Sequence, residues 1–194
     1  MAIKPILFNT EMVRAILDGR KSCTRRLVKF LPGENPQWTG YIRDELMLYN
    51  GKNEPCIRKA PYQPGDILYV RETWHKYTKR VGKGESCHLA EFYGYKASIA
   101  NSEDAEEPWK PSIHMPKEAA RIWLKVTDVR VERLQDMTDD DAEAEGCFDY
   151  TSTALGFPDV WDSTIKKSDL DSYGWSANPW VFVIEFERCE PLEV

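Results

Sequence analysis

The sequence has no uninterrupted apolar run approaching the roughly 18 residues that a membrane-spanning helix needs. Its first residues, MAIKPILFNTEM, contain neither a long apolar segment nor a small-residue cleavage site, so we expect no secretory signal peptide. Together these absences predict a cytoplasmic protein that has no membrane partner.

Cysteine and histidine are too scattered to indicate a metal site. The five cysteines are odd in number and form no C-x-x-C pair, and the three histidines are dispersed along the chain. Cys87 and His88 are adjacent, but neighbouring residues of a strand point to opposite faces. We therefore expect no disulfide framework, no metal and no cofactor.

The composition provides enough apolar residues for a packed core, and acidic residues outnumber basic ones. Hydrophobic residues make up 42% of the 194 residues and aromatic residues 12%, while 32 Asp and Glu outnumber 26 Lys and Arg. This composition predicts a single globular domain over residues 1–194. The net charge of -6 argues against broad binding to duplex DNA.

One short segment, GRKSCTRR from Gly19 to Arg26, is strongly basic; we call it the basic segment. Its four cations predict an anionic or electron-rich partner, such as RNA, a nucleotide or a modified nucleoside. Arg20, Ser22 and Arg26 are the candidate binding residues within it. The alternative is a helix C-terminus whose cations merely complement the helix dipole.

Lys21 and Thr24 of the basic segment are candidates for nucleophilic chemistry. A threonine hydroxyl is a weak nucleophile until a base takes its proton, and Lys21 can be that base if desolvation keeps it neutral part of the time. Since residues 21 and 24 of a regular strand face opposite sides, the two converge only if the chain still turns through Arg20 to Ser22. A solvated lysine beside a structural threonine is the alternative.

Glu145 is a third candidate, because its position is locally unfavourable. Thr138 predicts the start of a short acidic helix over Asp139 to Glu145, which Gly146 ends. A carboxylate at the C-terminal end of a helix opposes the dipole, and a residue in a costly place is a reasonable functional candidate.

A second group of candidates follows the strand Ile67 to Glu72. Arg71, Glu72 and Trp74 could hold a base by edge hydrogen bonds and stacking. The alternative is an ion pair of Arg71 at the rim of the sheet, with Trp74 as a lid on the core. His114, in the proline-bracketed loop PSIHMP, either faces the cavity or is a hydrogen-bonded structural histidine.

Hydrophobic patterning predicts about six strands and two or three helices without βαβ alternation, and therefore an α+β fold built on a small curled sheet or β-barrel. The expected strands are Ile3 to Phe8, Arg26 to Leu31, Ile67 to Glu72, His88 to Tyr95, Arg121 to Leu134 and Trp180 to Phe186. Pro64-Gly65-Asp66 predicts a tight turn before the third of these, and the last is apolar enough to be central. The expected helices start at Asn9 or Thr10 and at Asp139, and a third runs from Pro158 to Asp171 with Trp161 facing inward. A change of phase at Thr127-Asp128 predicts a β-bulge. Loop-rich insertions are expected at about 33–63, 98–115 and 149–179. The first should contain a hairpin over Tyr41 to Tyr49. The second should contain a solvated acidic loop over Ser102 to Glu107.

Five ordered segments, GRKSCTRR, PGDILYVRETW, WKPSIHMP, LKVTDVRVERLQDMTDDDAEAEG and NPWVFVIEF, together resemble the ASCH (activating-signal-cointegrator homology) domain proteins that bacteriophages and prophages often encode. The resemblance covers nearly the whole chain. It implies a PUA-like fold, which is a small β-barrel with flanking short helices, and an association with RNA or modified nucleosides.

The resemblance also implies roles for particular residues. One small bacterial branch removes the acetyl group of N4-acetylcytidine with a lysine, a threonine and a glutamate, which match Lys21, Thr24 and Glu145 here. Its G-x-K-x-x-T-x-R pattern also matches Gly19 and Arg26. Another branch has been linked to ribonuclease activity, which we consider the weaker expectation.

This chain departs from the family pattern in two respects. Ser22-Cys23 stands where the phage motif usually has Thr-Gln, and the chain is much longer than the minimal amidohydrolase domain. The alternatives are therefore a non-catalytic RNA- or nucleotide-binding module, and a phage structural or host-interaction protein with a vestigial pocket. The sequence predicts no oligomeric state.

Overall fold

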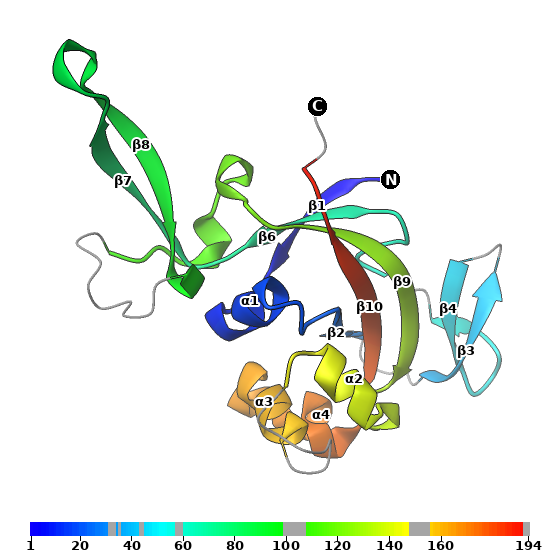
Figure 1. The fold of residues 1–194 in the computed structure, drawn as a ribbon. Helices are drawn as coiled ribbons and strands as arrows, with labels where there is room; N and C mark the ends of the chain where they lie inside the picture. The colour runs from blue at the N-terminus through cyan, green and yellow to red at the C-terminus, as the bar shows by residue number, and fades with distance from the viewer. Residues whose placement is uncertain are drawn as a thin grey trace.

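The computed structural model describes residues 1–30, 34, 36–42, 45–56, 60–98, 108–147 and 156–191. In these residues the chain is a mixed α+β protein, mostly strands with a few short helices, as the sequence predicted (Figure 1). The strands are β1 (Ile3–Leu7), β2 (Cys23–Leu27), β3 (Pro36–Ile42), β4 (Glu45–Asn50), β5 (Pro55–Cys56), β6 (Ile67–Arg71), β7 (Trp74–Val81), β8 (His88–Tyr95), β9 (Trp123–Arg133) and β10 (Trp180–Cys189), and the α-helices are α1 (Thr10–Leu17), α2 (Asp139–Ala144), α3 (Phe157–Thr164) and α4 (Leu170–Tyr173).

The central sheet has five strands in the order β1-β6-β9-β10-β2. Strands β1 and β6 are parallel, and the other pairs are antiparallel. The pairing of β9 with β10 shifts register so that Glu185 faces Asp128 and Phe186 faces Val126, which leaves Thr127 as an extra residue. This confirms the predicted bulge, and both long strands curve strongly (Figure 1).

The curled sheet does not close into a barrel within the described residues, because β1 and β2 remain its two edges. A side chain spans the seam between them. The Arg26 guanidinium, on β2, donates from Nη2 to the Leu7 carbonyl of β1 at 2.9 Å. The described strands therefore form an open, curled sheet, which is one of the two forms predicted from the sequence, and the other, a barrel, is not formed by these strands.

The core lies on both faces of β10, the strand predicted to be central. Phe182 and Ile184 belong to the cluster inside the curl, which α1 also enters through Val13. Val181 and Val183 point the other way and pack with residues of α2 and α3. Burial of each such side chain contributes roughly 1.5–3 kcal/mol, so β10 anchors the helices to the sheet.

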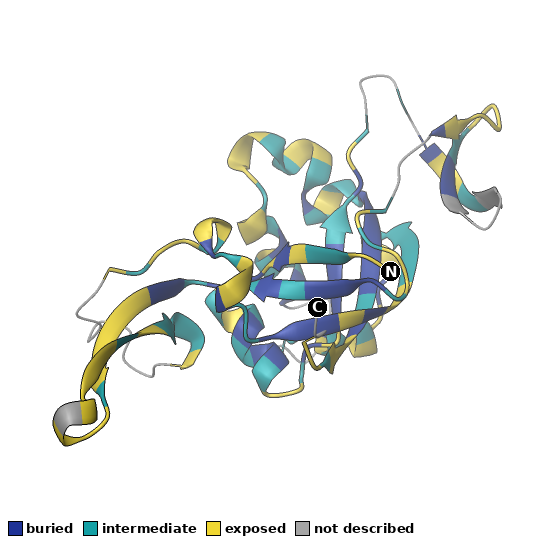
Figure 2. Cartoon of the chain, turned by 90° about the horizontal axis from the view of Figure 1, so that it is seen from above, coloured by how far each residue is buried: buried dark blue, intermediate teal, exposed yellow. Residues whose placement is uncertain are grey.

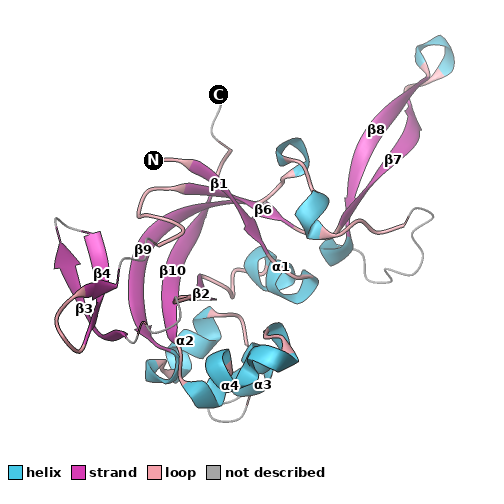
Figure 3. Cartoon of the chain, turned by 180° about the vertical axis from the view of Figure 1, so that it is seen from behind, coloured by secondary structure: helices cyan, strands magenta, loops and turns pink. Residues whose placement is uncertain are grey.

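Smaller units project from this body. Strands β3, β4 and β5 form a three-stranded sheet and β7 pairs with β8 in a long hairpin. The two units lie on opposite sides of the central sheet, and α2, α3 and α4 gather near one end of it (Figure 3). Buried residues concentrate in the central sheet, whereas the projecting hairpins carry much of the exposed surface (Figure 2).

Two expectations about these units need correction. The segment 33–63 contains three strands, so it is less loop-like than predicted, although the expected hairpin is present as β3 and β4. The helix predicted from Pro158 to Asp171 is broken: α3 ends at Thr164, a 3₁₀ turn follows, and α4 is separate. Ser163 and Thr164 donate side-chain hydrogen bonds to the Val160 and Trp161 carbonyls, which compete with continuation of the helix. The expected acidic loop over Ser102 to Glu107 lies outside the described residues.

No helix in the described part of the chain is long and apolar enough to cross a membrane.

Candidate functional site

The basic segment turns back on α1 through a left-handed glycine. Gly19 has a φ of +76°, and the amides of Arg20 and Lys21 both donate to the Ala15 carbonyl, at 2.8 and 3.1 Å. This closure ends the helix and reverses the chain before β2 begins. The turn that a convergence of Lys21 with Thr24 requires is therefore present.

Lys21 is buried in an ion pair with Glu145, the C-cap residue of α2. Its Nζ donates to Glu145 Oε2 at 2.6 Å, to the Glu145 carbonyl at 2.9 Å and to the Cys23 carbonyl at 2.7 Å. The two side chains are 0% and 5% exposed. All three ammonium protons have acceptors, so the resting lysine is a charged donor rather than a free base.

The second carboxylate oxygen of Glu145 holds strand β2. Oε1 accepts the backbone N–H of Arg25 at 2.6 Å, and the Arg25 guanidinium approaches the same oxygen at 3.5 Å. These contacts offset the unfavourable position of a carboxylate at a helix C-terminus. Glu145 therefore joins the end of α2 to the beginning of β2.

A second glycine lets the two helix ends meet at this ion pair. Gly146 follows Glu145 with a φ of +88°. A Cβ at this position would lie 2.8 Å from the Ala15 Cβ and 3.3 Å from the Lys21 Cβ. Only glycine combines this backbone conformation with so close an approach of α2 to α1.

Arg25 organises the charges behind the site, a role that the sequence did not reveal. Its side chain is fully buried, and Nη2 lies 2.7 Å from Glu132 Oε1 and 3.2 Å from Asp141 Oδ1. Burial acts to lower the pKa of Arg25, but the charge of Glu145 and the contacts with Glu132 raise it above its usual range. Arg25 is thus a permanent cation that ties α2 to the sheet.

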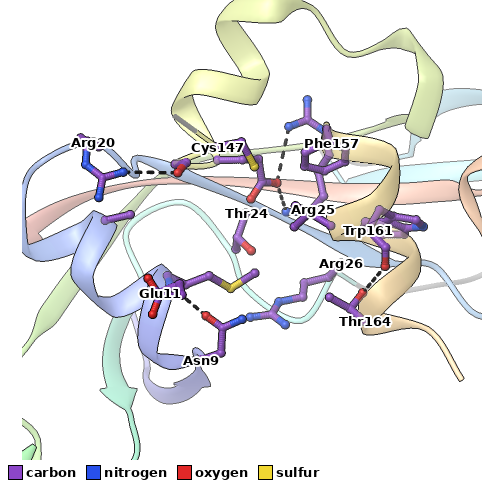
Figure 4. Close-up of a pocket in the computed structure, with 15 residues that line it drawn as sticks. Asn9, Glu11, Arg20, Thr24, Arg25, Arg26, Cys147, Phe157, Trp161 and Thr164 are labelled. Atoms are coloured by element: carbon purple, nitrogen blue, oxygen red, sulfur yellow. Dashed lines mark hydrogen bonds and ion pairs between the residues drawn. The ribbon is translucent and has the colours of Figure 1, made fainter. Parts of the chain in front are cut away.

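Thr24 precedes Arg25 on β2, and its side chain points to the opposite face of the strand. The residue is 2% exposed, yet its hydroxyl points into a cavity between α1, β2 and α3 (Figure 4). No other described residue forms a hydrogen bond with this hydroxyl. Within the described residues, Thr24 is therefore a hydroxyl without a partner at the wall of a pocket.

The cavity has a volume of about 510 Å³, which suits a ligand of nucleoside size. Two of the three catalytic candidates, Thr24 and Glu145, line it, whereas Lys21, the ion-pair partner of Glu145, is not part of the lining. The lining comprises Asn9, Glu11, Met12, Ala15, Arg20, Thr24, Arg25, Arg26, Glu145, Gly146, Cys147, Phe157, Val160, Trp161 and Thr164.

Chemically, the cavity has a polar wall and an aromatic wall. Glu11 and Arg26 project from the polar side, while Phe157 and Trp161 of α3 supply aromatic rings from the other side (Figure 4). These two rings are nearly parallel, at an interplanar angle of 26°, with centroids 6.3 Å apart. An apolar wall facing a few polar groups is typical of sites for small organic ligands.

Arg26 joins the cavity to the seam of the sheet. Besides its bond to the Leu7 carbonyl, its guanidinium lies over the Phe8 ring, 5.5 Å from the centroid. Burial lowers the pKa of Arg26, against the opposing influence of Tyr62 and Glu145. The predicted binding residue Arg26 is thus at the cavity, in a fixed orientation.

The structure places the other two binding candidates of the basic segment differently. Arg20 lines the cavity and forms an ion pair with Asp18 at 2.9 Å. Ser22 is exposed and is not part of the cavity lining, and its backbone amide donates to the Ala144 carbonyl at 2.8 Å. Ser22 therefore contributes backbone pairing rather than a side chain to this site.

The candidates after β6 do not line the cavity. Glu72 is 1% exposed and accepts two hydrogen bonds from Arg121, at 2.8 and 2.9 Å. The Arg71 guanidinium donates to the Ile113 carbonyl. Both charged groups are thus engaged within the protein.

Trp74 and His114 likewise lie outside the cavity lining. Trp74 is 6% exposed and packs with Met115 and Ala119 in a small separate core. This agrees with the alternative prediction that Trp74 covers a core rather than holds a base. His114 is exposed on a 3₁₀ turn. The sequence grouped these residues with the basic segment, but the fold separates them from its cavity.

Several cavity residues carried no functional signal in the sequence. Asn9 was expected only as a helix cap, and it does accept the Met12 amide at 2.8 Å. Trp161 was expected only to face inward. Glu11 and Cys147 were not singled out at all. Their proximity depends on the packing of α1, α2 and α3, which local sequence patterns do not specify.

In the described part of the chain, no three His, Cys, Asp or Glu side chains are grouped so that they could hold a metal ion. Comparisons with protein-family models, with curated proteins and with solved structures give no match. The function of this chain is therefore inferred from the residues of the cavity.

Proposed function

We propose that this chain binds a nucleobase-bearing ligand in the cavity and hydrolyses an acyl amide on the exocyclic amine of the base. The observation that carries the proposal is the hydroxyl of Thr24, which no described residue engages and which points into the cavity that Glu145 also lines. The resemblance to ASCH-domain proteins supports the same reaction, and the curled sheet with short helices is compatible with a PUA-like fold.

The two walls of the cavity suit such a ligand. A planar base would pack against Phe157 and Trp161, because aromatic faces stack on bases of any identity. Arg20, on the other side, would face the sugar hydroxyls or a phosphate. The amide would then lie over Thr24, between the two walls.

In the first step, Thr24 Oγ1 attacks the carbonyl carbon of the amide, and its proton leaves to a neighbouring base. The C–N bond then breaks, the amine takes a proton, and the acyl group remains on Thr24 as an ester. Water hydrolyses this ester, which returns the hydroxyl of Thr24 and releases the carboxylic acid. Arg26 would stabilise the negative charge that develops on the carbonyl oxygen.

The Lys21–Glu145 pair is the proposed proton carrier. Since the three protons of Lys21 are held by acceptors, one proton must move to Glu145 before the lysine can accept the proton of Thr24. The 2.6 Å contact between Nζ and Oε2 is short enough for that transfer. Glu145 would then return the proton to the departing amine.

The test is release of cytidine from N4-acetylcytidine, followed by chromatography. We expect Thr24→Ala to lower turnover by about 1000-fold or more without loss of thermal stability, while Thr24→Ser keeps measurable activity. Thr78→Ala is the matched control, because Thr78 is an exposed threonine on β7. Unchanged turnover in Thr24→Ala would overturn the proposed mechanism.

A second candidate function is non-catalytic binding of a nucleoside or nucleotide in the same cavity. The observation in its favour is that no described side chain forms a hydrogen bond with the Thr24 hydroxyl and so activates it in the resting structure. Tight binding of cytidine or its phosphate by the wild-type chain, without any turnover of acylated bases, would select this function. Arg26→Gln should weaken such binding whichever function is correct.

A further inference from the structure

The hairpin formed by β7 and β8 has no part in the cavity. Its pairing runs without interruption from Trp74 opposite Tyr95 to Val81 opposite His88. The hairpin, which we call the β7–β8 arm (residues 74–95), projects away from the central sheet and the helices (Figure 1). An extended, solvent-facing ribbon of this kind is a surface available to a partner.

One face of the arm carries a ladder of rings. His75 contacts Trp109 at its base, with centroids 4.6 Å apart, and contacts Tyr77 at 5.4 Å. Tyr77 in turn stacks on Phe92, its direct cross-strand partner, at 5.7 Å and 27°. The rings therefore run without a break from the base of the arm to its middle.

The ring at the base of the ladder is buried and packed, whereas the outer rings are partly exposed to solvent. His75 is 8% exposed and lies across Gly94, where any side chain would clash with the imidazole ring. Tyr77 and Phe92 are each 37% exposed. The packed base thus holds two partly exposed rings in place, which lowers the entropic cost of contact with a ligand.

Cations continue this surface toward the tip of the arm. Lys79 is two residues beyond Tyr77 and so shares its face, and Lys83 lies further along, at the tip, whereas Arg80 is paired with Leu89 on the opposite face. All three are exposed, and none has an ion-pair partner among the described residues. Lys76, on the opposite face, is instead paired with Glu91 at 2.7 Å.

The charge of the arm is opposite to that of the whole protein. Residues 74–95 contain four Lys and Arg against two Glu, whereas the chain has a net charge of -6. A positive arm on an acidic body favours an anionic partner and directs it away from the rest of the surface.

We propose that the β7–β8 arm binds single-stranded nucleic acid, with bases stacked on Tyr77 and Phe92 and phosphates beside Lys79 and Lys83. Aromatic rings beside exposed cations are the combination that single strands bind. The bases of a duplex already stack on one another, so a single strand fits these rings better. This inference does not depend on the reaction proposed for the cavity.

The experiment measures fluorescence anisotropy of a labelled 16-nucleotide RNA of mixed sequence with the full chain, and repeats it with DNA of the same sequence and with the RNA duplex. We expect the double variant Tyr77→Ala/Phe92→Ala to bind the single strand about tenfold more weakly or worse. Lys79→Gln/Lys83→Gln should reduce the slope of log affinity against log salt by about 1.4.

Two controls separate the ladder from the rest of the protein. Leu89→Ala removes an apolar side chain, 67% exposed, from the opposite face of the same arm and should leave affinity unchanged. Asp171→Asn, at an exposed aspartate on α4 outside the cavity lining, should also bind normally. Tyr77→Leu/Phe92→Leu keeps the apolar bulk of the arm, so it tests the rings even if the alanine variant unfolds.

Several outcomes would overturn the proposal. These are absence of single-strand binding at low salt, equal binding by the leucine double variant, and binding that is lost in Arg26→Gln but kept in both ladder variants. Self-association of the wild-type chain that the ladder variants abolish, without nucleic-acid binding, would assign the arm to a second copy instead. Preference for RNA over DNA, or the reverse, would show which of the two nucleic acids the arm binds.

Discussion

Lys21 Nζ lies 2.6 Å from Glu145 Oε2, although 124 residues separate the two in the chain. The contact joins the turn after α1 to the end of α2 in a place that water barely reaches. Buried pairs of this kind tolerate the loss of one partner poorly, because the remaining charge has no compensation. The pair is therefore both a structural anchor and the centre of the proposed chemistry.

We expect Glu145→Gln to destabilise the protein by about 3 kcal/mol, since it leaves the buried ammonium of Lys21 without a counter-charge. Urea denaturation measures the loss. Glu143→Gln, at an exposed glutamate on the same helix, is the control and should change stability little. In the double variant Lys21→Met/Glu145→Gln the loss should be smaller than the sum of the two single losses. Additive losses would show that the pair has no coupling.

Gly146→Ala should destabilise the protein more than the same substitution at Gly65. Both glycines have a positive φ, +88° and +86°, so alanine is strained at each by roughly 1 kcal/mol or more. Only at Gly146 does the new Cβ also meet Ala15, which adds overpacking of roughly 1–3 kcal/mol. Thermal unfolding of the two variants gives the comparison. Equal losses would mean that α1 and α2 can move apart freely.

Cys23 should resist thiol reagents in the folded protein. Burial, followed by the negative charge of Glu145, raises the pKa of this thiol to about 12, and only the thiolate reacts. Treatment with iodoacetamide at pH 8, followed by peptide mass spectrometry, should modify exposed Cys87 first and Cys23 only after urea is added. Early modification of Cys23 would contradict the buried arrangement of β2.

Stability should fall in acid partly through Asp66. Burial acts to raise its pKa, but hydrogen bonds from Lys4, Ala2 and Gln63 outweigh that effect and hold the folded pKa below the ordinary 3.8. Its contribution is therefore complete above the unfolded value and disappears as the pH falls through the lower folded value.

The check on Asp66 is a series of urea denaturations between pH 6 and pH 2. Asp66→Asn should be less stable than wild type at pH 6, and the difference should shrink toward pH 2. Asp171→Asn, at an exposed aspartate on α4, serves as the control. A difference that stays constant with pH would rule out this linkage.

Elements with local signals could be predicted from the sequence. The Asn9 and Thr138 caps, the turn before β6 and the phase change at Thr127 all depend on neighbours within a few residues. Each was found close to its predicted position.

Elements that depend on distant pairing could not be predicted as well. Strand β2 begins at Cys23, three residues before the predicted Arg26, because its pairing with β10 places Cys23 opposite Glu185. Strand β7 was missed, since most of its residues are exposed and its pattern contains no apolar alternation.

The candidate site likewise has residues that the sequence predicts and a spatial arrangement that it does not. Lys21, Thr24 and Glu145 could be named from residue type and position, but the cavity that Thr24 and Glu145 line depends on where α3 packs. The fully buried Arg25 was indistinguishable in sequence from Arg26 beside it. Their different roles follow from the alternation of a strand whose position only the fold determines.

The seam of the curled sheet is spanned by a side chain, whereas each of its neighbouring strand pairs is joined by backbone hydrogen bonds. Backbone hydrogen bonds between strands form with almost any side chains, but the contact across the seam depends on one residue, Arg26. A substitution at Arg26 can therefore widen or narrow the gap between β1 and β2 while every strand keeps its register. A single mutation can in this way change the size of the ligands that the protein accepts.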